Sequence, residues 1–255
     1  MTRIIMSGCC GRMGRVITDI VAADLDTEIV AGIDIIEDER MTYPIYANPA
    51  DIKEEADVII DFSSPKVLGR LIDYAVSKKI PMVLCTTGYS EEEVKLINET
   101  SEKIAILRSG NMSLGINTII NLLKTATSVF CPAGFDVEIV EQHHHNKLDA
   151  PSGTALMLAD AVNEAGGGDY EYIYDRSDRR AKRDAKELGI SAVRAGSIPG
   201  THEVIFAGQD EVIEIKHIAY SRNIFGNGAV SAAKFLAAKE SGMYSMRDVI
   251  DQAIS

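Results

Sequence analysis

The chain has 255 residues, 46% of them hydrophobic and 25% charged, and its formal net charge is -12. This acidity opposes general binding to nucleic acid or to an anionic membrane, so an anionic ligand would need a local basic site. No stretch approaches the roughly 18 to 20 apolar residues of a membrane span, and the first six residues are too short for a signal peptide. We expect a cytoplasmic protein with two domains.

The first part of the chain predicts strands that alternate with helices. An apolar run ends in the glycine-rich turn GCCGRMG, after which apolar residues recur at helical spacing. Ser90 and Glu93 form a capping box that should open a later helix. The apolar runs are typical of a parallel sheet buried on both faces. We therefore predict a Rossmann-type, doubly wound α/β domain with strands at residues 3–7, 28–33, 57–62 and 80–84.

The pattern changes near Ser113, where a long helix through Phe130 is expected. The strands predicted after it indicate an α+β domain with an antiparallel or mixed sheet, at residues 135–140, 189–196, 202–208 and 211–220. Two closing helices, at residues 226–241 and 245–254, should return to the first domain. We predict two domains, one at residues 1–113 plus 223–255 and the other at residues 114–222.

Two further features predict no ligand site. The basic run at residues 175–187 interleaves six cations with four acids, which favours a solvated helix face over a nucleic-acid patch. The cysteines lack the spacing of a metal site and should be reduced, although adjacent Cys9 and Cys10 could form a strained vicinal disulfide. We expect no metal.

Gly8, Gly11 and Gly14 place a GxxGxxG pattern at the first strand-to-helix turn. Glycine there lets the backbone approach a pyrophosphate, which a helix N-terminus stabilises. Asp34, about 20 residues farther on, has the type and position to bind the ribose hydroxyls of a dinucleotide. A turn that needs glycine only for helix packing is the alternative.

Two more loops leave the carboxyl ends of predicted strands, CTTG at residues 85–88 and SGNMS at residues 109–113. Ligands of open α/β sheets bind at that edge, where small hydroxyl and amide residues can bond a ribose or a carboxamide. Ordinary turn chemistry explains each loop equally well when it is taken alone.

The segment EQHHHNKLDAPSGTA, residues 141–155, joins a predicted strand to a predicted helix. Histidine titrates near neutral pH and lysine is a compact cation, while Ser152, Gly153 and Thr154 offer N–H groups at a helix N-terminus. These groups can hold an anion and deliver a proton. Zinc is disfavoured because three adjacent histidines cannot easily converge on one tetrahedral ion. A purely structural role for the cluster is the other alternative.

Several motifs together resemble the 4-hydroxy-tetrahydrodipicolinate reductase family, also called the dihydrodipicolinate reductases. They span the chain in order and are GCCGRMG, DFSSP, CTTGY, GNMSLGIN, EQHHHNKLDAPSGTA, RAGSIPGTHEV and FGNGAVSAAKFL. The resemblance implies NAD(P)H-dependent reduction of a cyclic dicarboxylate imine, with release of water, in lysine and diaminopimelate biosynthesis. It also implies a homotetramer, a dinucleotide-binding domain at residues 1–113 plus 223–255, and a substrate-binding and oligomerisation domain at residues 114–222.

The resemblance also implies roles for single residues. His143 would be the general acid, and Lys147 would share in the proton step. The substrate would be bound by His144, Lys147, Ser152, Gly153 and Thr154. The cofactor would be bound by Gly8, Cys9, Cys10, Gly11, Arg12, Met13, Asp34, Phe62, Cys85, Thr86, Thr87, Gly110, Asn111, Met112 and Ser113.

This chain departs from the family pattern at two places. His145 and Asn146 stand where the family often has Arg and His, so the pocket would carry one cation fewer. Cys9 and Cys10 replace small residues in the turn. Two alternatives stay open: another two-domain nicotinamide enzyme, such as an amino-acid dehydrogenase, and a non-catalytic dinucleotide sensor.

The residues after Asp34 predict the cofactor preference. Asp34 can accept hydrogen bonds from the ribose hydroxyls of NADH but would repel the 2′-phosphate of NADPH. Ile35 stands where dual-specificity members of the family often have Arg. Arg40 could reach the phosphate only if its loop folds back, and Arg12 is another possible partner. NADH should therefore be preferred, with NADPH used less well.

Overall fold

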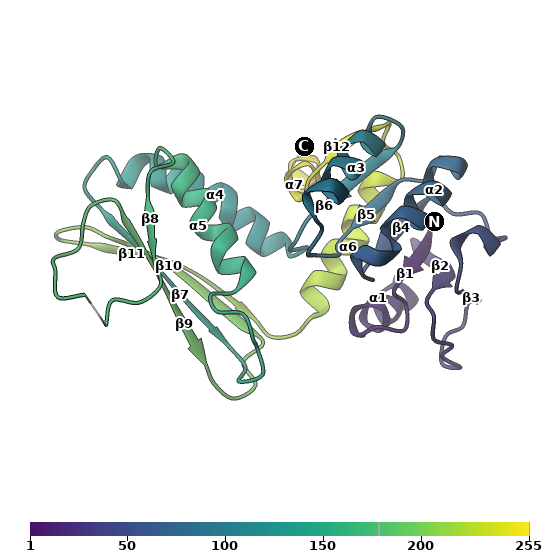
Figure 1. Cartoon of the computed structure of the whole chain (residues 1–255), viewed down its shortest axis with the longest axis horizontal. Coiled ribbons are helices and arrows are strands. Elements are labelled where there is room, and N and C mark those ends of the chain that lie inside the picture. The colour runs from purple at the N-terminus through teal and green to yellow at the C-terminus, as the bar shows by residue number, and fades with distance from the viewer. Residues whose placement is uncertain (178, 255) are drawn as a thin grey trace. The chain divides into compact units, whose positions relative to one another are not determined.

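The computed structural model describes the chain apart from residues 178 and 255, and it divides into two compact units, both drawn in Figure 1. Unit 1 comprises Met1–Leu114 and Arg222–Ser255, and unit 2 comprises Gly115–Ser221.

Unit 1 is built on a seven-stranded sheet in which all neighbouring strands run parallel. The strand order is β12-β6-β5-β4-β1-β2-β3. The strands are β1 (Thr2–Ser7), β2 (Thr27–Ile33), β3 (Ile45–Tyr46), β4 (Val58–Asp61), β5 (Met82–Leu84), β6 (Ala105–Arg108) and β12 (Gly242–Tyr244). The helices are α1 (Arg12–Ala22), α2 (Leu68–Lys78), α3 (Glu91–Ser101), α6 (Asn223–Leu236) and α7 (Met246–Ile254). The predicted doubly wound fold is confirmed.

Successive side chains of the central strands point to opposite faces of this sheet, so the sheet contributes to two separate hydrophobic cores. On β1, Ile4 and Met6 face the core shared with α1, α6 and α7, whereas Ile5 faces the core shared with α2 and α3. All three side chains are fully buried. A strand in which both faces are apolar can be covered only by helices on both sides, which explains the doubly wound arrangement.

Unit 2 contains a five-stranded mixed sheet with strand order β11-β10-β7-β9-β8. β10 is antiparallel to β7 and β11, whereas β9 is parallel to β7 and β8. The strands are β7 (Asp136–His143), β8 (Glu171–Ile173), β9 (Glu187–Arg194), β10 (Gly200–Ala207) and β11 (Val212–Ala219). Two helices, α4 (Leu114–Phe130) and α5 (Gly153–Ala165), contribute to its core. This confirms the predicted second domain with a mixed sheet.

The prediction of a helix face at residues 175–187 is wrong for the part of the run that the structure describes, which excludes residue 178. No helix forms there, and Glu187 instead begins β9. Arg183 pairs with Asp136 and Glu138 on β7, and Arg179 pairs with Glu187. These two arginines are therefore held by acids of the sheet, which local charge spacing could not reveal.

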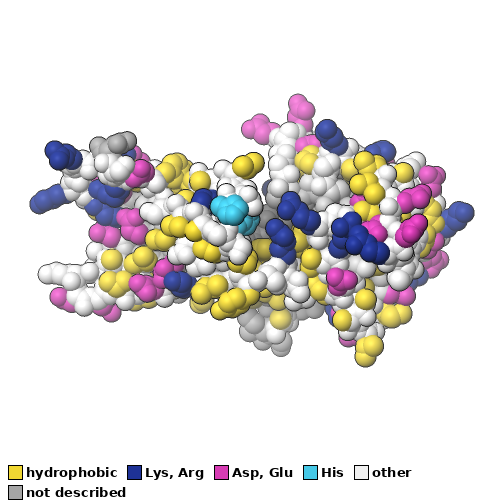
Figure 2. Space-filling model, turned by 90° about the horizontal axis from the view of Figure 1, so that it is seen from below, with side chains coloured by type: hydrophobic (Ala, Val, Ile, Leu, Met, Phe, Trp, Pro, Cys, Tyr) yellow, Lys and Arg dark blue, Asp and Glu magenta, His cyan; other side chains and the backbone are white. Residues whose placement is uncertain are grey.

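Charges of both signs are mixed on the face of the molecule that Figure 2 shows. Among the described residues, no helix combines the length and the apolar character needed to cross a membrane.

Candidate active site

The glycine-rich turn of unit 1 packs closely against its own backbone and leaves no room for side chains at Gly8 and Gly14. A Cβ on Gly8 would lie 2.6 Å from the carbonyl oxygen of Phe62, and one on Gly14 would lie 2.3 Å from that of Gly8. Gly8 also has a φ of +79°, which L residues rarely adopt. α1 begins directly after Gly11 and has no side-chain cap at that residue. The turn therefore presents backbone N–H groups at a helix N-terminus, as a pyrophosphate requires.

A cavity of about 280 Å³ lies beside this turn. Four residues predicted for the cofactor are among those that line it: Gly8, Gly11, Asp34 and Phe62. The Asp34 carboxylate accepts hydrogen bonds from the backbone N–H of Cys10 at 3.0 Å and of Ile36 at 3.2 Å. These bonds fix the carboxylate next to the turn, where it can accept bonds from ribose hydroxyls. The residues present therefore fit a dinucleotide.

The other residues predicted to bind the cofactor differ in how far their side chains are exposed. The side chains of Cys9, Cys85 and Met112 are packed in a hydrophobic core of unit 1, so they offer a ligand only their backbone. Buried Asp61, at the end of β4, accepts a hydrogen bond from Thr86 at 2.7 Å. The remaining residues are buried (Cys10, Asn111, Ser113), half-buried (Met13) or exposed (Arg12, Thr87, Gly110).

The centre of the candidate site in unit 2 is Glu141, which is fully buried on β7. One carboxylate oxygen lies 2.6 Å from Nδ1 of His143, and the other accepts the backbone N–H of Ser152 at 3.0 Å. Arg194 donates to both oxygens, at 2.8 and 2.7 Å. Burial alone would raise the pKa of Glu141, but Arg194 and His143 outweigh it and lower that pKa. Glu141 is therefore a charged anchor that orients its neighbours.

His143 is the last residue of β7, so the prediction that the cluster lies wholly on a connection is wrong for this residue. Its buried ring turns Nδ1 toward Glu141. Burial lowers the pKa of His143, and the hydrogen bond with Glu141 opposes that shift. Nε2 lies beside Gly200, where an added Cβ would be only 3.1 Å away. The glycine thus leaves room at the ring nitrogen that can exchange a proton.

A second buried histidine supports the same corner of the site. His202 Nε2 lies 2.9 Å from Oγ of Ser152, whose Oγ also accepts the backbone N–H of Ala155 and so caps α5. Its ring packs edge-on against that of His143, with centroids 5.1 Å apart. Burial lowers the pKa of His202 to about 3, and neighbouring His143 adds to the shift. His202 is therefore neutral near pH 7 and acts as a structural hydrogen-bonding group.

The predicted substrate residues follow His143 in the chain. Lys147 pairs with Asp149 at 2.9 Å and is only partly exposed. His144 is half-buried, and its Nδ1 has no hydrogen-bond partner in the described part of the chain. His145 and Asn146, which depart from the family pattern, are both exposed. Gly153 and Thr154 form the first turn of α5, directly after the Ser152 cap.

Sequence reasoning did not assign roles to Glu141, Arg194, Gly200 and His202. All four lie within motifs that carried the resemblance, EQHHHNKLDAPSGTA and RAGSIPGTHEV. The pairing of parallel strands β7 and β9 places His143 opposite Arg194, which are 51 positions apart in sequence. An acidic residue within such a motif, such as Glu141, could have been proposed to orient the neighbouring side chains. Its partner Arg194 could not, because that contact depends on the register of β7 against β9.

The arrangement can perform acid–base chemistry on an anion. A histidine is held by a buried carboxylate, a lysine follows it four residues later, and a helix begins ten residues later. The five histidines of the chain all belong to unit 2, and exposed histidine side chains are visible there in cyan in Figure 2.

Comparison with known proteins covers nearly the whole chain. Sequence models described as "Dihydrodipicolinate reductase, N-terminus" and "Dihydrodipicolinate reductase, C-terminus" match residues 2–112 and 115–250. A 4-hydroxy-tetrahydrodipicolinate reductase of Caldanaerobacter subterraneus is 49% identical over 250 residues, 98% of each chain. One from Clostridium tetani is 50% identical over 246 residues, 96% of each chain.

A solved structure shares the fold. It is a dipicolinate-bound dihydrodipicolinate reductase from Paenisporosarcina sp. TG-14, with a TM-score of 0.82 and 22% identity over 96% of this chain and 97% of that one. The C. glutamicum DAP dehydrogenase, in complex with DAP, is a more distant likeness, with a TM-score of 0.60 and 14% identity over 100% of this chain and 95% of that one.

Proposed function

The chain belongs to the dihydrodipicolinate reductase family, and we propose that the Glu141-anchored histidine of unit 2 is the acid of its reaction. The reaction is the NAD(P)H-dependent reduction of 4-hydroxy-tetrahydrodipicolinate to tetrahydrodipicolinate, with release of water, in lysine and diaminopimelate biosynthesis. The observation that carries the assignment of the acid is the hydrogen bond between His143 and buried Glu141, 2.6 Å long.

The cofactor supplies a hydride when it is bound. After water has left the substrate, the ring holds a conjugated imine, and its reduction produces an electron-rich enamine that must gain a proton. We assign this proton to Nε2 of His143, because Glu141 holds Nδ1 and Gly200 leaves space at Nε2. The substrate is a dianion, so its binding should favour the imidazolium that burial disfavours in the free protein.

Lys147 and the first turn of α5 are the proposed partners of the substrate carboxylates. Lys147 must exchange Asp149 for the substrate, since the two side chains now form an ion pair. Gly153 and Thr154 lie at the start of a 13-residue helix, where backbone N–H groups and the helix dipole favour an anion. The dicarboxylate named in the Paenisporosarcina structure has the chemistry that such partners bind.

We propose that NADH is used better than NADPH, by about tenfold in kcat/KM, since one unfavourable charge contact in a partly solvated site is worth roughly 1 to 2 kcal/mol. Asp34 supplies the like charge, and exposed Ile35 supplies no compensating cation. Parallel steady-state assays with the two cofactors at low ionic strength measure the ratio. Equal efficiency would contradict the role given to Asp34.

The test of the proposed function is turnover. The purified protein is supplied with freshly made product of the preceding synthase, and NADH oxidation is followed by absorbance. We expect oxidation that depends on the substrate and is inhibited by pyridine-2,6-dicarboxylate. If the substrate stimulates oxidation of neither NADH nor NADPH, the proposal fails.

We further propose that the protein acts in the cytoplasm as a homotetramer, as the family resemblance implies. Light scattering should then give the mass of four 27.7 kDa chains.

A further inference from the structure

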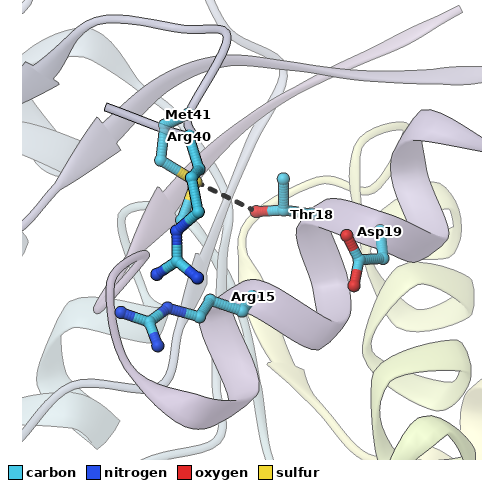
Figure 3. A pocket seen from close by; sticks show the side chains of 5 residues that line it. All are labelled: Arg15, Thr18, Asp19, Arg40 and Met41. Atoms are coloured by element: carbon cyan, nitrogen blue, oxygen red, sulfur yellow. Dashed lines mark hydrogen bonds between the residues drawn. The ribbon is translucent and has the colours of Figure 1, made fainter. Parts of the chain in front are cut away.

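The loop after β2 folds back onto α1 and brings two arginines together. Met41 and Tyr43 attach it there: the Thr18 hydroxyl of α1 lies 2.7 Å from that of Tyr43, and the Tyr43 hydroxyl lies 3.2 Å from Sδ of Met41. Figure 3 shows the resulting pocket, with Arg15 extending from α1 and Arg40 from the loop. The pocket has a volume of about 160 Å³. Arg40 is thus placed by the folded loop, which the sequence left undecided.

Both arginines bind the same carboxylate, that of Asp38. Nη2 of Arg15 lies 3.1 Å from Oδ2 of Asp38, and Nη2 of Arg40 lies 2.6 Å from that oxygen. Nε of Arg40 donates to Oδ1 at 2.8 Å, so the pair is bidentate. The Asp38 side chain is only 10% exposed, although those of Arg15 and Arg40 are 48% and 69% exposed. Two guanidinium groups on one anion form the usual arrangement for binding a phosphate monoester.

This pocket lies next to the predicted ribose site. Cys10 connects the two, because its N–H binds Asp34 while its thiol donates to the carbonyl oxygen of Ile36 at 3.1 Å. Burial raises the pKa of the Cys10 thiol, and Asp34 and Asp38 are both near enough to raise it further. The predicted ribose site at Asp34 is therefore bordered by a second acid, Asp38, and by the two arginines that bind it.

We propose that Arg15 and Arg40 form a subsite for the 2′-phosphate of NADPH, and that Asp38 occupies this subsite as an internal carboxylate. A phosphate must displace Asp38 before it can use the two cations. The preference for NADH then has two sources. Asp34 repels the 2′-phosphate of NADPH, and Asp38 competes with that phosphate for the two arginines. This inference rests on the proposed use of a nicotinamide dinucleotide, and it adds the residues that set the choice between the two forms.

The test measures binding of nucleotide fragments, so it needs no turnover. Adenosine 2′,5′-bisphosphate and ADP are titrated calorimetrically into the wild type and into Asp38→Asn at low ionic strength. We expect Asp38→Asn to bind the 2′-phosphorylated fragment about tenfold more tightly, with ADP binding changed less than twofold. Adding Arg40→Ala should remove the gain, because it removes the bidentate partner. kcat/KM for NADPH should rise by a similar factor.

Glu37→Gln is the matched control, since it removes the same charge from an exposed position of the same loop. An equal gain in this variant would show a general charge effect and would overturn the subsite. No gain in Asp38→Asn, at an unchanged melting temperature, would also overturn it. Tightening of ADP by the same factor as adenosine 2′,5′-bisphosphate would show an effect that does not depend on the 2′-phosphate, and would again contradict the proposal. Failure of the wild type to bind ADP would instead contradict the dinucleotide site itself.

Discussion

The two units prepare their candidate sites in different ways. In unit 1 the site is made largely of backbone: glycines bring a turn, a strand end and a helix N-terminus together, and the thiols of Cys9 and Cys10 are buried. In unit 2 the site is made of side chains arranged around the buried carboxylate of Glu141. The site in unit 1 should tolerate changes of side-chain chemistry but no atom added at its glycines. The site in unit 2 should tolerate few changes of side-chain chemistry, because each group is a hydrogen-bond partner of another. The following predictions test this contrast.

Replacing the proposed acid should have the largest effect. His143→Gln keeps a polar group near Glu141 but cannot deliver a proton, so kcat should fall by roughly 10²- to 10⁴-fold while NADH binding changes little. Stopped-flow turnover and NADH fluorescence measure the two quantities. His145→Gln changes an exposed neighbour and should leave both unchanged. A near-normal kcat for His143→Gln would rule out this residue as the proton donor.

Adding one methyl group to the turn tests the backbone site. A Cβ on Gly14 would lie 2.3 and 2.4 Å from the carbonyl oxygens of Gly8 and Cys9, so Gly14→Ala must move the turn away from α1. We expect a loss of about 3 kcal/mol in the free energy of unfolding and weaker NADH binding. In Gly69→Ala the added Cβ meets no atom within 4 Å, so this variant should be at least as stable as the wild type. Similar denaturation midpoints for the two variants would contradict the prediction.

Removing the substrate cation should have an intermediate effect. Lys147→Ala leaves a substrate carboxylate without its charge partner and should lower kcat/KM by about 2 kcal/mol, or roughly 30-fold. Pyridine-2,6-dicarboxylate should also inhibit this variant less. Lys186→Ala breaks a comparable ion pair with Asp169 elsewhere in unit 2 and serves as the control. Unchanged inhibition of Lys147→Ala would place the dicarboxylate at another anion site.

His202 should make stability depend on pH. Its pKa is about 3 in the folded protein and about 6.5 in an unfolded chain. Between these values the unfolded state binds more protons, so stability rises with pH and is lost as pH falls from about 6.5 toward 3. The slope should be about 1.4 kcal/mol per pH unit from this group. Urea denaturation at several pH values should show a smaller slope in His202→Gln than in His145→Gln. Equal slopes would mean that His202 is not buried in its neutral form.

Features set by neighbouring residues could be predicted from the sequence. The capping box of Ser90 and Glu93 is an example, because both of its hydrogen bonds lie within one helical turn. The glycine turn and its helix were likewise visible as a local pattern. In contrast, β12 has only three residues and pairs with β6, so no periodicity could reveal it.

The hydrogen bonds between Glu141 and Arg194 in unit 2 could not be predicted either, because they join residues far apart in the sequence. Arg194 reaches Glu141 from 53 positions away, and only the register of β7 against β9 brings them together. The histidines themselves were conspicuous in the sequence, but the buried groups that orient them were not. The loop carrying Asp38 and Arg40 was also undecided, since its path over α1 depends on contacts made by Thr18, Met41 and Tyr43.

Helix α6, which follows unit 2 in the chain, has a consequence for synthesis of the protein. α6 packs on α1 through Gly226, where an added Cβ would lie 2.5 Å from Cδ1 of Ile20. Residues 222–254 are synthesised after unit 2, so the surface of α1 that α6 covers and the edge of β6 that pairs with β12 are exposed while unit 2 is already complete. The contiguous unit should therefore fold first, and the interrupted one should be the part that needs protection from aggregation during translation.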